Sequence, residues 1–88
     1  MIFLYITLGS ITTAARLKKL LEASSGYPAD VVHTPGKLNK TGECSYSVRA
    51  DERLLKIVRP LCDENGIRIK KIYIEEIRDG ERVFNEVS

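Results

Sequence analysis

The chain has 88 residues, of which 43% are hydrophobic and 30% are charged, and its formal net charge is +2. This length fits a single domain, residues 1–88, and the composition excludes a disordered chain. The net charge does not indicate nucleic-acid binding, because the basic residues are interleaved with acidic ones.

The N-terminal segment is an apolar run without the charged start or cleavage site of a signal peptide. Residues 2–8 (IFLYITL) are too few to span a bilayer and are typical of a central strand. The two cysteines, Cys44 and Cys62, cannot complete a zinc site unaided. We therefore expect a cytoplasmic protein with reduced cysteines, no metal or cofactor, and no membrane or nucleic-acid partner.

Two stretches have apolar residues at helical spacing. The first follows Ser10, a good N-cap, and ends before Gly26. Its apolar positions are Ile11, Ala14, Leu17, Leu20 and Leu21. The second follows Asp51 as N-cap, and we expect Pro60 to kink it. Its apolar positions are Leu54, Leu55, Val58, Leu61 and Cys62.

Strands are predicted at residues 2–8, 29–33, 44–49 and 71–77. The order β-α-β-β-α-β predicts an α+β fold, the ferredoxin-like sandwich, in which the first and third strands pair centrally. Both helices then pack on one face of an antiparallel sheet. Asp79-Gly80 is a hairpin signal, so residues 78–88 form either a short hairpin with an extra strand or a frayed tail, and we favour the hairpin.

The segment from Thr34 to Arg49 (TPGKLNKTGECSYSVR) is a polar loop that leads into an alternating strand. Long loops in small domains are commonly functional, so we place any chain-specific function here. One face of the strand carries Cys44, Tyr46 and Val48, and the other carries Ser45, Ser47 and Arg49.

Cys44 has two interpretations. It either packs inward with its apolar neighbours or is an exposed thiol whose thiolate is favoured by Lys37, Lys40 and Arg49. Such a thiolate can attack a sulfur or selenium donor and hold the atom. Cys62, on an apolar helix stripe, is predicted to be a core residue, and His33 a surface or structural histidine without a definable triad.

Three known uses of this fold lack support in the residues. An RNA-recognition sheet needs several exposed aromatic residues on its central strands, and the strand after the loop offers only Tyr46. The paired cysteines of a copper chaperone and the phosphate-binding loop of an acylphosphatase are both missing after the first strand.

Taken together, the chain resembles the putative selenium/sulfur carrier protein-like family. The resemblance rests on an apolar strand and helix (YITLGSITTAARLKKLLE), the Thr34-Pro35 step, and the loop that ends at Cys44. A second helix and a final strand complete it, so that it covers about residues 2–77. The family usually has glycine after the cysteine, whereas this chain has Ser45.

The resemblance implies a cytoplasmic carrier that holds sulfur or selenium on Cys44 for transfer to a partner protein, and we expect a carrier or binding module more than an enzyme. The residues expected to line this site are Thr34, Pro35, Thr41, Gly42, Ser45 and Arg49. The alternative is a non-catalytic regulatory or dimerisation module that associates through its sheet edges, which includes a homo-oligomer. A redox enzyme using both cysteines is disfavoured, because a cysteine on a helix stripe is badly placed for a disulfide.

Overall fold

A computed structural model describes residues 2–39, residue 42 and residues 45–87. The strands are β1 (Phe3–Leu8), β2 (Ala29–His33), β3 (Tyr46–Asp51), β4 (Lys71–Arg78) and β5 (Glu81–Val87). The helices are α1 (Ile11–Ser25) and α2 (Leu55–Glu64), and two short 3-10 turns are η1 (Gly36–Leu38) and η2 (Glu52–Leu54).

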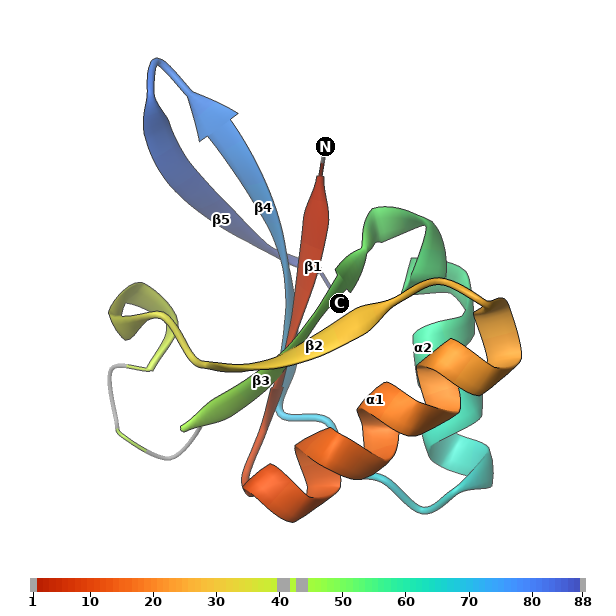
Figure 1. The fold of residues 1–88 in the computed structure, drawn as a ribbon. Helices are drawn as coiled ribbons and strands as arrows, with labels where there is room; N and C mark the ends of the chain where they lie inside the picture. The colour runs from red at the N-terminus through yellow and green to blue at the C-terminus, as the bar shows by residue number, and fades with distance from the viewer. Residues whose placement is uncertain (1, 40–41, 43–44, 88) are drawn as a thin grey trace.

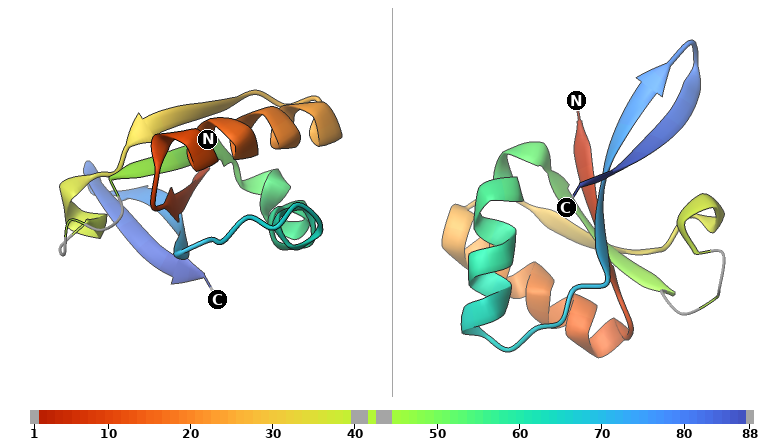
Figure 2. Two further views of the ribbon diagram at one scale, coloured as in Figure 1. Left: turned by 90° about the horizontal axis from the view of Figure 1, so that it is seen from below. Right: turned by 180° about the vertical axis from the view of Figure 1, so that it is seen from behind.

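The fold is α+β, with one five-stranded sheet in the order β2-β3-β1-β4-β5 (Figure 1). Every neighbouring pair of strands is antiparallel. β1 lies between β3 and β4, as its uninterrupted apolar sequence predicts. Both helices cover the same face of the sheet, which the two views of Figure 2 show from below and behind.

The core lies between this face and the helices. β1 contributes Leu4, Ile6 and Leu8, each 0% exposed. The helices contribute Ala14, Leu17, Leu21, Val58 and Cys62, and η2 contributes Leu54. No helix in the described ranges is long and apolar enough to cross a membrane.

The helix ends follow the predicted local signals, with two corrections. The Ser10 side chain accepts a hydrogen bond from the Thr13 N–H at 3.2 Å, which caps α1 as expected. Asp51 accepts from the Arg53 N–H at 2.9 Å, so it caps η2, and α2 begins only at Leu55. Ile11 is 53% exposed instead of packing with the apolar stripe, because it occupies the first turn of α1 at the edge of the core.

The hairpin predicted at Asp79-Gly80 is present, and the chain returns as β5. Asp79 and Gly80 have φ angles of 50° and 79°, the pattern of a type I′ turn, in which glycine avoids backbone strain. β5 pairs with β4 from Arg78 opposite Glu81 to Ile72 opposite Val87. It is therefore longer than the short strand that the sequence indicates.

The face opposite the helices, here called the open face, carries Phe3, Tyr5 and Thr7 of β1 and the alternate residues of the other strands. Tyr5 is only 3% exposed there. Its ring meets that of Phe84 edge-on at 5.4 Å, and its hydroxyl accepts a hydrogen bond from Arg82 at 3.0 Å. Arg82 also forms an ion pair with Glu75. Side chains of β5 thus cover Tyr5 on the open face.

We expect Leu17→Ala to lower the free energy of unfolding by about 3 kcal/mol, because it leaves a cavity in the core under α1. Ile11→Ala on the same helix is the matched control, and we expect it to change stability by less than about 0.5 kcal/mol. Urea denaturation measures both. Equal losses for the two variants would contradict the placement of Ile11 outside the core.

Candidate functional site

The loop that bears Cys44 starts and ends at paired strands. The Thr34 N–H donates to the Ser45 carbonyl at 3.0 Å, just beyond the pairing of His33 with Tyr46. The hydroxyls of Thr34 and Ser47 lie 2.7 Å apart. These contacts fix the two ends of the loop against each other at one end of β2 and β3.

The Thr34–Ser47 pair is the part of this site that the sequence does not reveal. Both residues belong to the open face, yet Ser47 is 0% and Thr34 is 8% exposed. Each hydroxyl supplies the partner that the other needs, since a buried polar group without a hydrogen bond is costly. Strand alternation assigns Ser47 to this face but cannot show that the face is covered there.

The first half of the loop is a compact turn. Pro35 precedes η1, and its carbonyl accepts from the Leu38 N–H at 2.8 Å. Gly42 has a φ of 77°, which favours glycine over residues with a side chain, and its N–H donates to the Asn39 carbonyl at 3.3 Å. Lys37 reaches across the open face and donates to the Arg82 carbonyl of β5 at 3.3 Å.

Cys44 and Thr41 lie outside the described residues, as do Lys40 and Glu43. Of the residues predicted to line the site, the structure therefore places Thr34, Pro35, Gly42, Ser45 and Arg49. The first four belong to the loop or its base, and the Ser45 side chain, next to Cys44 in the chain, is exposed.

Arg49 is not brought to the base of the loop. It lies four residues after Ser45, about 13 Å along an extended strand. Its guanidinium is 4.7 Å from the centre of the Phe3 ring and 3.4 Å from Asp30. Its Nε is buried without a hydrogen-bond partner among the described residues. The role of Arg49 beside the Cys44 thiolate stays a prediction.

Cys62 is a core residue, as predicted. Its side chain is 1% exposed on the inner face of α2, although it borders a hollow of about 300 Å³ beneath the connection to β4. Burial raises the pKa of the Cys62 thiol to about 11, and Asp63 adds to this effect. Cys62 is therefore a neutral, poorly nucleophilic thiol at physiological pH.

His33 is an exposed residue at the end of β2, and its ring centre lies 5.1 Å from that of Tyr46. Within the part of the chain that the structure describes, no three His, Cys, Asp or Glu residues gather in a way that could hold a metal ion. His33 thus contributes to an aromatic contact at the loop base.

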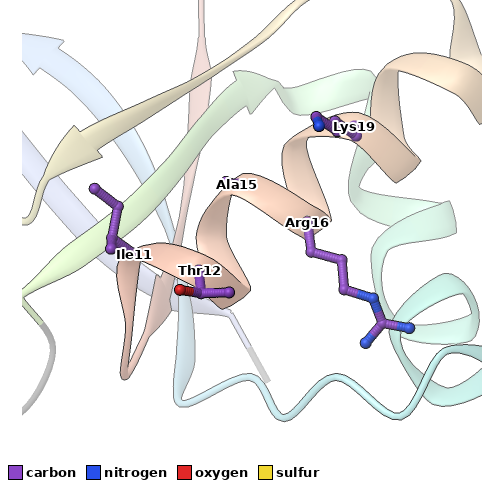
Figure 3. Close-up of a pocket in the computed structure, with 5 residues that line it drawn as sticks. All are labelled: Ile11, Thr12, Ala15, Arg16 and Lys19. Atoms are coloured by element: carbon purple, nitrogen blue, oxygen red, sulfur yellow. The ribbon is translucent and has the colours of Figure 1, made fainter.

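A shallow hollow of about 480 Å³ lies on the outer side of α1, away from the loop. Its lining residues are Ile11, Thr12, Ala15, Arg16 and Lys19. Figure 3 shows that all of them come from this one helix and that Ile11 and Arg16 point in different directions. No second element among the described residues closes the hollow, so it does not form a binding site by itself.

The comparisons with known proteins gave one finding. The model of the family described as "Putative Se/S carrier protein-like" matches residues 3–74. No curated protein and no solved structure matches the chain. The matched span begins with β1, includes the whole loop before β3, and ends within β4.

Ser47→Ala should lower the free energy of unfolding by about 1–3 kcal/mol, because it leaves the buried Thr34 hydroxyl without its partner. The double variant Thr34→Val/Ser47→Ala removes both polar groups and should recover most of that loss. Ser45→Ala, at an exposed position of the same strand end, is the control. Losses that simply add in the double variant, measured by urea denaturation, would show that the hydroxyl pair contributes nothing.

The raised pKa of Cys62 makes stability fall at alkaline pH. The folded state keeps the thiol proton up to about pH 11, whereas the unfolded state loses it from about pH 9. The stabilisation is thus complete below about pH 9 and declines as the pH rises towards 11. In a Cys44→Ser background, the stability difference between Cys62 and Cys62→Val should shift in favour of Val over this range, and a constant difference would refute it.

Proposed function

The chain belongs to the Putative Se/S carrier protein-like family, and we propose that it holds sulfur or selenium on Cys44 and passes the atom to a partner protein. The observation that carries the assignment to Cys44 is the burial of Cys62. A carrier thiol must meet both donor and acceptor, and Cys62 is 1% exposed in the core. Of the two cysteines in the sequence, Cys44 is the one that remains for this role.

The proposed loading step is thiol–persulfide exchange. The Cys44 thiolate attacks the outer sulfur of a donor persulfide, R–S–SH, and forms a new S–S bond. The S–S bond of the donor breaks, and the donor leaves as the thiolate RS⁻. The products are a Cys44 persulfide and a donor thiolate, so the step needs no external oxidant. A selenium donor, R–S–SeH, reacts in the same way.

Delivery repeats the exchange in the other direction. A nucleophile of the acceptor protein attacks the outer atom held on Cys44, and the bond between that atom and the Cys44 sulfur breaks. Cys44 returns as a thiolate and can be loaded again. The proposed role is therefore that of a carrier and not of an enzyme with its own small-molecule product.

The described part of the loop supports this role through its anchored ends. Thr34 and Ser45 are joined at 3.0 Å by a backbone hydrogen bond, and the hydroxyl pair below them is buried. A rigid base reduces the entropy lost when a partner docks onto the loop. We assign Pro35, Thr41 and Gly42 to shaping the loop, and the exposed Ser45, where the family usually has glycine, to controlling access to the sulfur.

The proposal also includes a fold assignment and a cellular compartment. Without β5, the strand order is β2-β3-β1-β4, and we assign these four strands and the two helices to the ferredoxin-like arrangement. A carrier thiol also requires a reducing compartment to stay available, so we place the protein in the cytoplasm.

The test is the alkylation rate of Cys44 against pH in a Cys62→Ala background. We expect a fast reaction in the folded protein, with a midpoint below the ordinary thiol pKa of about 8.5. After incubation with a low-molecular-weight persulfide, mass spectrometry should show one added sulfur atom, and Cys44→Ser should show none.

The carrier role fails if the Cys44 thiol stays inert until the protein unfolds. In that case Cys44 packs inward, and the alternative of a non-catalytic assembly module replaces the carrier. Cys62→Ala alone should load as well as the natural sequence, because Cys62 takes no part in the exchange.

A further inference from the structure

β5 is the outer strand of the sheet and lies beyond the span that the family model matches. It pairs with β4 on one side, and no described strand pairs with its other side (Figure 1). An open strand edge presents unpaired N–H and C=O groups and invites another strand. We propose that two copies of this chain pair through β5, antiparallel, around a two-fold axis at Phe84.

The backbone of β5 has the required pattern on its outer edge. In a two-residue hairpin the closing pair, here Arg78 and Glu81, is hydrogen-bonded, and the bonding then alternates along the strands. Arg82, Phe84 and Glu86 therefore direct their N–H and C=O groups away from β4. The Arg82 carbonyl agrees with this direction, because it accepts a hydrogen bond from Lys37, which lies outside the β4–β5 hairpin.

The sequence of β5 is complementary to itself in one register. Pairing Glu81 with Val87 of the second copy uses the whole strand and places Phe84 opposite Phe84. Arg82 then lies opposite Glu86 of the second copy, and Glu86 opposite Arg82. Opposite charges and aromatic pairs at facing positions stabilise antiparallel strands.

Other registers lose this match. An axis at Arg82 places two arginines opposite each other, and an axis at Glu86 does the same with two glutamates, which is destabilising. An axis at Val83 leaves Glu86 facing Gly80, beyond the strand end. The charge pattern of β5 thus favours the register that is also the longest.

The side chains of this edge are already held in place within one chain. Arg82 forms an ion pair with Glu75 and donates a hydrogen bond to the Tyr5 hydroxyl. Glu86 forms an ion pair with Lys71 at 3.1 Å. The side chains of Arg82 and Glu86 are nevertheless 52% and 53% exposed, so both can still interact with a second copy. Side chains ordered before association lose less entropy when they bind.

Lys37 does not block this pairing. A carbonyl oxygen has two lone pairs, so the Arg82 carbonyl can keep its bond to Lys37 and accept an N–H from the second copy. The paired dimer joins two five-stranded sheets into one continuous sheet. The proposed dimer does not rest on the carrier role of Cys44, because its interface is formed by β5. Lys37 is the one residue named here that belongs to the loop bearing Cys44, and it does not block the pairing.

The test exchanges the charges of the edge. Arg82→Glu sets two glutamates opposite each other across the interface, and Glu86→Arg sets two arginines there, so each variant alone should be a monomer in sedimentation equilibrium. The natural sequence should approach twice the mass of one chain as its concentration rises. In an equimolar mixture of the two variants, only like pairs carry these repulsions. A pair of unlike chains sets a glutamate opposite an arginine at both facing positions in the same register, so the mixture should recover the dimer.

The double variant Arg82→Glu/Glu86→Arg restores the interface. It again sets opposite charges at both facing positions, with their order reversed, and should therefore recover the dimer that each single change abolishes. Recovery in the double variant also shows that the single variants fail through repulsion and not through lost folding.

Arg16→Glu, the same charge change on the outer side of α1, is the matched control and should leave the dimer unchanged. Thermal unfolding monitored by circular dichroism verifies that each variant is folded. A monomeric natural sequence at every concentration would overturn the proposal. Dimers that persist in both single variants would also overturn it, since they would place the interface elsewhere.

Discussion

The pairing of β1 on both of its edges is the constraint on which the rest of the structure depends. Its register with β3 sets Thr7 opposite Ser47, and its register with β4 sets Thr7 opposite Lys71. The Thr7 hydroxyl reinforces the second register, because it accepts from the Lys71 N–H at 2.9 Å. A shift by one residue would move the buried leucines of β1 to the open face, so the loop base and the β4–β5 hairpin keep their positions only in this register.

Much of the fold follows from signals that are local in the sequence. Ser10, Asp51 and Asp79-Gly80 mark turns and caps through short-range hydrogen bonds and backbone angles, and the structure has a turn or cap at each of them. Ile11 shows the limit of periodicity. Helical spacing gives the direction of a side chain around the helix axis, but not whether the sheet extends far enough along that axis to cover it.

The site is less predictable, because its decisive contacts join distant segments. Alternation assigned Ser47 and Arg49 to one face of β3 without showing what lies above them. Ser47 meets Thr34 across the loop base, and Arg49 stacks on Phe3 of β1. In the sequence, Arg49 is only five residues from Cys44, which suggested a thiolate partner; along the extended strand, Arg49 lies about 13 Å from Ser45, the described residue next to Cys44.

Side chains of β5 cover part of the open face. Phe84 and Arg82 cover Tyr5, and Lys37 of η1 reaches the Arg82 carbonyl from the other side. Among the described residues, the loop and the hairpin therefore meet at an exposed hydrogen bond, although the strands that carry them lie apart in the sheet order. Because this bond leaves the second lone pair of the carbonyl available, pairing of β5 does not require the loop to move. A carrier thiol in the loop and an assembly edge on β5 are thus compatible in one small domain.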